Sequence, residues 1–114
     1  MVFGERSGAT LMRRLARVDQ CLSSNLLEAE LRAVCVRESV TLTPAALDWL
    51  KWVLPDRPLT SELERVLARG YVKGADAWHL ACALYVAEDP RHLTFLTLDA
   101  RQRTVARRLG FRAP

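Results

Sequence analysis

Long hydrophobic runs are missing from this sequence. The longest apolar stretch, residues 77–87, is interrupted by His79. It is far shorter than the roughly 20 apolar residues that a helix needs to cross a bilayer. The opening residues carry charges at Glu5, Arg6 and Arg13 and contain no continuous apolar segment of the kind found in secretory signal peptides. We therefore expect no transmembrane helix, no membrane partner and a cytoplasmic location.

Cysteine is scarce and shows no pairing pattern. Cys21, Cys35 and Cys82 are odd in number, have no CxxC spacing and lie among apolar residues. Such cysteines are typical of small buried side chains in a reducing compartment. The sequence therefore predicts neither a disulfide framework nor a zinc site.

Lysine is almost absent, since Lys51 and Lys73 are the only lysines among the 17 basic residues and the other 15 are arginine. The net charge of +4 and the isoelectric point of about 9.4 favour a polyanionic or acidic protein partner. Arginine binds phosphate through two parallel hydrogen bonds, whereas a GC-rich genome also enriches arginine without any function. The composition leaves both explanations open.

What the sequence does contain is enough apolar material for one core. Its 114 residues are 50% hydrophobic, which suits one domain and not two. Segments with helical spacing alternate with short apolar segments that suit strands, and this alternation is typical of an α/β domain with a mainly parallel sheet. We therefore predict a single α/β domain over residues 1–114.

The bounds of the expected elements are set by turn and capping residues. Helices are predicted over residues 10–17, 25–37, 61–69, 75–88 and 100–109, and another begins at Thr43 and Pro44. Strands are predicted over residues 21–22, 52–54 and 93–99, and the last of these has the strongest pattern. Capping boxes are expected at three helix starts: Asn25 with Glu28, Ser61 with Glu64, and Asp99 with Gln102.

Glu30 stands at an unusual position for a charge. The residues three and four positions away from it on the predicted helix are all apolar: Leu26, Leu27, Ala33 and Val34. A buried carboxylate without a partner costs several kcal/mol unless a cation, a hydrogen-bond donor or protonation compensates for it. Glu30 either meets such compensation or lies at a helix edge that reaches solvent, and both alternatives stay open.

Asp76 and Asp99 each have an ordinary structural explanation beside a functional one. Asp76 falls in the first turn of a predicted helix, where the helix dipole favours a negative charge. Asp99 is a good N-cap, but it also ends a predicted parallel strand, where ligands bind in open α/β sheets. Thr97 would add a hydroxyl group on the same face. His79, beside Trp78, is interpreted as a packed core residue with no metal role.

Together, Glu30, Asp76 and Asp99 can converge on one hard divalent cation, which prefers oxygen ligands and keeps several waters. Such a site activates water and neutralises the charge that develops on a phosphate under attack. The sequence contains no HExxH, Walker, GxGxxG or nucleophile-elbow pattern. It therefore favours metal-ion chemistry that needs no dedicated serine or histidine nucleophile.

Three stretches of the sequence resemble the motifs of PIN domains, especially the VapC-type toxins of bacterial type II toxin–antitoxin systems: SSNLLEAELRA, GADAWHLACALYVA and FLTLDARQRTVARRLGF. Their order also matches. A Ser-Ser pair precedes a helix with Glu-Leu, an Asp is followed by His-Leu-Ala, and Thr-x-Asp leads into a helix that ends in Leu-Gly. Each motif is weak alone, whereas the set is specific and covers nearly the whole chain.

The resemblance implies a PIN-like parallel sheet flanked by helices and a metal-dependent ribonuclease that hydrolyses RNA phosphodiester bonds. Glu30, Asp76 and Asp99 take three of the family's acidic positions, which hold Mg²⁺ or Mn²⁺ and carry the catalysis, and Thr97 supports them. The expected partners are RNA, a small antitoxin protein and a second copy of the chain in a homodimer. Candidate contacts to RNA phosphates lie in the last helix: Arg101, Arg103, Arg107 and Arg108.

The sequence departs from the family at its start. Family members begin with a central strand that ends in an Asp-Thr-Ser-like turn, whereas VFGERSGATLMRRL resembles the segment after that turn. We therefore expect the first central strand and the first acidic metal ligand to be missing, and ribonuclease activity to be impaired. The alternative is a catalytically inactive interaction module that binds an antitoxin or a dimer partner. A third reading is a fragment that folds poorly by itself, because an incomplete sheet exposes unpaired edges.

Overall fold

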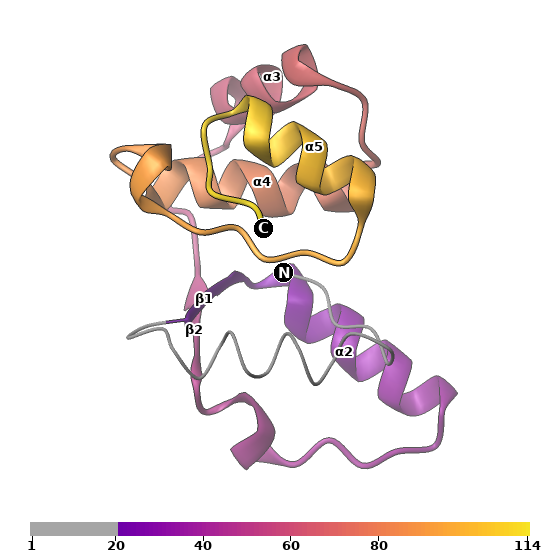
Figure 1. Cartoon of the computed structure of the whole chain (residues 1–114). Coiled ribbons are helices and arrows are strands. Elements are labelled where there is room, and N and C mark those ends of the chain that lie inside the picture. Colours follow the sequence, from indigo (N-terminus) through magenta and orange to yellow (C-terminus); the bar gives the residue numbers. More distant parts are fainter. Residues whose placement is uncertain (1–20) are drawn as a thin grey trace.

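The computed structural model describes residues 21–114, which form helices and a small sheet (Figure 1). The strands are β1 (Cys21–Ser24) and β2 (Leu50–Val53). The helices are α2 (Leu26–Arg37), α3 (Thr60–Arg69), α4 (Gly74–Val86) and α5 (Ala100–Arg108), with two short 3-10 helices, η1 (Pro44–Leu47) and η2 (Pro90–His92). The α/β class is therefore confirmed for these residues. The helix predicted over residues 10–17 lies outside them.

The two strands form a parallel sheet in which Cys21 pairs with Leu50 and Ser24 pairs with Val53. Helix α2 lies in the connection between them, because two parallel strands need a long crossover to bring the chain back to the same end. Leu50 and Val53 are buried, which explains why this short apolar segment pairs. Both weakly patterned strands are thus confirmed, and their bounds are longer or earlier than predicted.

Helix α4 lies at the centre of the arrangement. Helices α3 and α5 pack on one side of it, whereas β1, β2 and α2 lie on the other side (Figure 1). The main core is enclosed by these helices, and its most deeply buried side chains include Leu59, Val66, Leu80 and Val105. Full burial of such a side chain contributes about 1.5–3 kcal/mol, so this core supplies most of the stability that fixes α4 in place.

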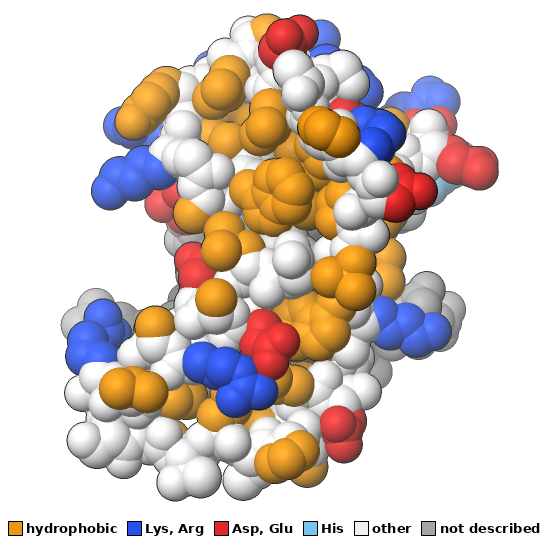
Figure 2. All heavy atoms as spheres, turned by 180° about the vertical axis from the view of Figure 1, so that it is seen from behind, with side chains coloured by type: hydrophobic (Ala, Val, Ile, Leu, Met, Phe, Trp, Pro, Cys, Tyr) orange, Lys and Arg blue, Asp and Glu red, His pale blue; other side chains and the backbone are white. Residues whose placement is uncertain are grey.

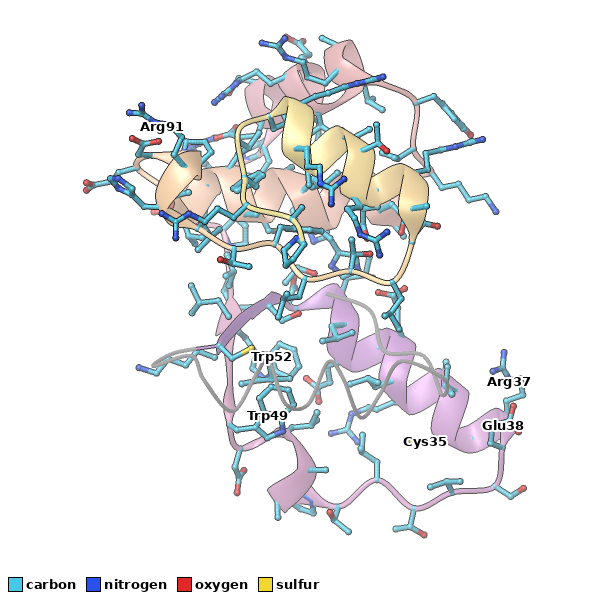
Figure 3. The ribbon with its side chains drawn as sticks, in the orientation of Figure 1. Cys35, Arg37, Glu38, Trp49, Trp52 and Arg91 are labelled. Carbon is cyan, nitrogen blue, oxygen red and sulfur yellow. The ribbon has the colours of Figure 1, made fainter. Side chains whose placement is uncertain are left out.

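A second, smaller cluster holds α2 against the sheet. Its buried members are Leu27 of α2 and Leu50 of β2, with Trp52 packed beside them. Figure 3 shows the side chain of Trp52 between β2 and α2. Cys35 and Arg37 lie toward the other end of α2, away from the sheet (Figure 3). Within residues 21–114, the first half of α2 supplies the contacts of this cluster, and Glu30 belongs to that half.

Residues 93–99, which have the strongest strand pattern in the sequence, are not a strand in the structure. Their backbone forms one isolated bridge, from Thr94 to Arg112, with hydrogen bonds from Phe95 N to Arg112 O (2.7 Å) and from Arg112 N to Leu93 O (3.1 Å). The prediction was wrong because a strand needs a neighbour that continues the ladder of hydrogen bonds, and among the described residues the pairing of this segment is limited to the single bridge at Arg112. Phe95 is buried, so the apolar pattern reflects burial rather than pairing.

Two of the three predicted capping boxes are also wrong. Asn25 has helical backbone angles (φ −63°, ψ −19°), and its side chain does not cap α2. Glu28 instead forms an ion pair with Arg32 at 2.8 Å. Helix α3 begins before Ser61, whose hydroxyl donates to the carboxylate of Glu62 at 2.9 Å. Short polar side chains take whichever local partner the backbone angles allow, and spacing alone does not reveal that choice.

The remaining helix bounds lie close to the predicted ones. Helix α4 differs from the predicted 75–88 by a residue or two at each end, and α5 ends at the expected place, where Gly110 has φ 103°. The helix expected from Thr43 and Pro44 is a single 3-10 turn, with proline at its first position as predicted. None of the helices described in residues 21–114 has the length and apolar composition needed to cross a bilayer.

Candidate functional site: three carboxylates and a buried histidine

A chain of hydrogen bonds joins three elements of the fold. The hydroxyl oxygen of Ser24, at the end of β1, lies 2.6 Å from Nδ1 of His79 on α4. The other ring nitrogen of His79, Nε2, lies 2.6 Å from Oε1 of Glu30 on α2. Ser24 and His79 are both buried, whereas the Glu30 side chain is 43% exposed. The chain therefore runs from the interior to the surface and ends in a carboxylate.

The chemistry of these groups fixes the direction of each hydrogen bond. An ionised carboxylate only accepts hydrogen bonds, so Nε2 of His79 carries the proton that it donates to Glu30. In a neutral imidazole the other nitrogen is then an acceptor, and the hydroxyl of Ser24 donates to Nδ1. Burial lowers the pKa of His79, which keeps the ring neutral at physiological pH.

The sequence left two alternatives for Glu30, a compensating partner or a position at a helix edge that reaches solvent. The structure shows both in part. Its carboxylate reaches solvent and also receives the hydrogen bond from His79. His79 is buried in the core, as expected, but it contacts a carboxylate that the sequence placed in a metal site. Ser24 and His79 are the site residues that sequence reasoning missed. The signal that could have revealed them is that each is a polar side chain near apolar residues in the sequence. A polar group buried there needs a hydrogen-bond partner.

Asp76 lies on α4 one helical turn before His79 and is half-buried. Burial raises the pKa of its carboxyl group, and the negative charge of Asp99 raises it further. The charge of Glu30 acts in the same direction, while His79 and Lys73 oppose it. The pKa of Asp76 is therefore raised, and burial is the largest cause. The three carboxylates come from three elements, and the charges of Asp99 and Glu30 both act on Asp76.

Asp99 is the N-cap of α5, so the third predicted capping box has the expected cap. Its Oδ1 accepts a hydrogen bond from the backbone N–H of Gln102 at 2.7 Å. Thr97, which is buried, bonds to the Gln102 side chain, whose amide nitrogen also donates to the backbone oxygen of Asp76 at 3.3 Å. Thr97 and Gln102 thus tie the start of α5 to the start of α4 and hold Asp76 and Asp99 near each other.

The three side chains fit a hard divalent cation in donor type and in charge. Their donors are all carboxylate oxygens, which Mg²⁺ and Mn²⁺ prefer. Apart from the hydrogen bond of Glu30 to neutral His79, they form no side-chain ion pair with the described residues. In residues 21–114, however, no three Asp, Glu, His or Cys side chains are grouped closely enough to hold a metal ion. The carboxylates are electrostatic neighbours and not a preassembled set of ligands.

The four arginines expected to contact RNA lie on α5 and are not equally free. Arg101 is exposed. Arg103 is half-buried, donates to the backbone oxygen of Thr97 at 3.1 Å and has a buried Nε without a partner among the described residues. Arg107 and Arg108 are exposed, and each donates one hydrogen bond to a backbone carbonyl. Three of the four therefore present a guanidinium group to solvent.

An apolar cavity of about 110 Å³ is lined in part by His79. Its walls come from β1, α4 and residues 93–96, and Ser23, Ser24 and His79 are among its polar members. None of the three carboxylates lines it. The cavity thus shares His79 with the hydrogen-bond chain but is not lined by the acidic residues.

Comparisons of the chain with family models, with curated proteins and with solved structures found no match. Its function is therefore inferred from its residues and their geometry.

Proposed function

We propose that this chain is a PIN-like, metal-dependent ribonuclease of the VapC toxin type that hydrolyses RNA phosphodiester bonds. The observation that supports it best is the setting of Asp76, because burial and the negative charges of Asp99 and Glu30 all raise the pKa of its carboxyl group. Three like charges from α2, α4 and the start of α5 are costly to bring together without a counter-ion. A divalent cation is the natural counter-ion for such a group.

A bound Mg²⁺ or Mn²⁺ would activate water and stabilise the charge that develops on the phosphate. The residues of the chain would divide the remaining tasks. Glu30, Asp76 and Asp99 hold the cation, and Thr97 supports the start of α5 through Gln102. The exposed arginines of α5 lie on the helix that begins at Asp99, where they can bind the RNA backbone next to the site.

We expect the activity to be low. The three carboxylates are not preassembled in the described residues. Mg²⁺ gives up water reluctantly and demands near-octahedral geometry, so it penalises an incomplete site more than Mn²⁺ does. Mn²⁺ should therefore be the better cofactor for this chain.

The test is cleavage of a mixed-sequence RNA by the purified chain in Mn²⁺, with EDTA as the metal-free reference. Asp76→Asn removes one charge with little change of shape and should reduce the rate at least tenfold, on the order of the effect of disturbing a metal site. Glu28→Gln is the matched control, since Glu28 lies on the same helix as Glu30 but pairs with Arg32. Cleavage that continues undiminished in EDTA or in Asp76→Asn would refute the proposal.

A second candidate is a catalytically inactive module that binds an antitoxin or a dimer partner. It is favoured by large apolar side chains at the surface, including Leu67 at 49% and Tyr71 at 68% exposure. Figure 2 shows hydrophobic side chains gathered on one face of the molecule. Leu67 and Tyr71 line an open hollow together with Leu63 and Trp78. Exposed apolar surface of this kind marks interaction sites more often than catalytic ones.

Sedimentation velocity distinguishes this candidate. A chain that cleaves no RNA in any cation, sediments as a dimer and becomes monomeric in Leu67→Ser would support the interaction module. Ala68→Ser, on the same exposed surface of α3, serves as the control. A monomeric chain with Mn²⁺-dependent cleavage would support the nuclease.

A further inference from the structure

We infer that His79 is a positioning residue, which holds the carboxylate of Glu30 in place for a divalent cation, and that the hydroxyl of Ser24 holds the other edge of the His79 ring. The part that concerns the cation rests on the function proposed above. The two hydrogen bonds of His79 do not depend on that function, because both are 2.6 Å contacts between side chains of the folded chain.

Glu30 needs a partner if its carboxylate is to keep one position. A glutamate on a helix surface moves among several rotamers, and fixing it costs about 1.5–2 kcal/mol of side-chain entropy. His79 is a donor that does not move, because its side chain is 1% exposed and α4 is packed on both sides. Ser24 is buried at the end of β1 and holds the other edge of the ring. The position of Glu30 is therefore set by the core.

The choice of partner matters as much as its rigidity. Glu28, two residues earlier, pairs with the guanidinium of Arg32, which cancels its charge. Glu30 instead accepts a 2.6 Å hydrogen bond from the imidazole of His79, whose ring is buried and whose other nitrogen contacts Ser24. An imidazole that donates one hydrogen bond orients the carboxylate without bringing the permanent positive charge of a guanidinium. Such a hydrogen bond from a neighbouring group is how metal ligands are usually oriented.

The geometry also leaves room for the cation. His79 occupies only Oε1 of Glu30, and Oε2 makes no hydrogen bond with the described residues. The Glu30 side chain is 43% exposed. Asp76 lies one turn before His79 on α4. The oriented carboxylate is thus bonded to the helix that carries Asp76, the group with which it would share a cation.

The first test reads the hydrogen bonds without any metal. Long-range ¹H–¹⁵N spectra of the metal-free chain at pH 8 should show His79 in the tautomer with the proton on Nε2. The chain has two histidines, and His79→Gln assigns the signal by removing one of them. A proton on Nδ1 would overturn the inference, because Nε2 could not then donate to Glu30.

The second test measures Mn²⁺ affinity by the electron paramagnetic resonance signal of free Mn²⁺, without RNA. His79→Leu removes the donor and should weaken binding about 10–100-fold, as loss of a ligand-orienting group does. His79→Gln, whose amide can donate in place of Nε2, should keep most of the affinity. Ser24→Ala should weaken Mn²⁺ binding less than His79→Leu does. It also tests the inference if the His79→Leu variant does not fold. Circular dichroism checks the fold of each variant.

A double-mutant cycle separates positioning from a general structural role. If His79 acts through Glu30, His79→Leu should cause no further loss in a Glu30→Gln background. An equal loss with and without the Glu30 carboxylate would overturn the inference. A chain that binds no Mn²⁺ would refute the proposed function together with the cation part, and the tautomer would still decide whether His79 holds Glu30.

Discussion

Asp99 carries two roles that a single pair of substitutions can separate. In the folded chain its Oδ1 caps α5 through the backbone N–H of Gln102 at 2.7 Å, and in the proposed function its charge binds the cation. Asp99→Ala removes both the acceptor and the charge. Asp99→Asn keeps a side-chain oxygen in the capping position and removes only the charge, since asparagine is as good an N-cap as aspartate.

The magnitudes can be worked from these contacts. Loss of a capping hydrogen bond costs about 1 kcal/mol, and loss of a negative charge at a helix N-terminus costs about 0.3–1 kcal/mol. Asp99→Ala should therefore lose about 1.3–2 kcal/mol, and Asp99→Asn at most about half of that. For a domain of this size 1 kcal/mol corresponds to about 4 °C in Tm. We expect the alanine variant to melt about 5–8 °C below the wild type and the asparagine variant about 1–4 °C below it.

Thermal melts followed by circular dichroism at 222 nm, in EDTA at pH 7, measure both values. Asp48→Ala is a suitable control, because Asp48 is exposed and comes after η1 rather than before a helix. Equal melting of the two Asp99 variants would show that the charge, and not the cap, stabilises α5. An alanine variant within about 1 °C of the wild type would refute the capping role. Both variants should lose Mn²⁺-dependent cleavage to the same extent.

Three further predictions concern stability. Leu80 is fully buried on α4, so Leu80→Ala should lower the free energy of unfolding by about 2–5 kcal/mol in a denaturant titration. A loss below about 1 kcal/mol would mean that neighbouring side chains move in to fill the cavity. The guanidinium of Arg57 lowers the pKa of Glu62 from 4.5 to about 2; this ion pair therefore stabilises the fold above pH 4.5, and its contribution is lost as the pH falls toward 2. Glu62→Gln should flatten the fall in Tm over that range, and an unchanged pH profile would contradict this. Gly110 has φ 103°, so Gly110→Ala should lower the free energy of unfolding by about 1 kcal/mol or more, and a stabilised variant would disprove the need for glycine there.

The helices were largely predictable from the sequence, because their patterns depend on neighbours in the chain. Helix α4, for example, is indicated by one apolar run, and the end of α5 is indicated by Gly110. Residues 93–99 were not predictable in the same way. Their apolar and β-branched side chains suit a strand, but a strand exists only where another segment pairs with it. Here the apolar pattern describes burial beside α4 and α5.

The candidate site was predictable only in part. Asp76 and Asp99 were chosen from their places at a helix start and a segment end, and the effect of the Asp99 charge on the pKa of Asp76 agrees with proximity. The bonds from His79 to Ser24 and Glu30 were not foreseen. They join residues 55 and 49 positions apart, and no local pattern encodes such a contact. What the sequence did offer was an unexplained carboxylate on an apolar helix face.

The same separations have a consequence for the order of folding. The Ser24–His79 and Glu30–His79 bonds each close a loop of about 50 residues. Compared with a 10-residue loop, closure of such a loop costs about 1.4 kcal/mol more in chain entropy. Two hydrogen bonds contribute about 1–3 kcal/mol together, which is comparable with this added cost alone, so we expect them to form once α4 has packed into the main core. The site should therefore form late, and His79 variants should mainly accelerate unfolding, whereas Leu80→Ala should slow refolding as well.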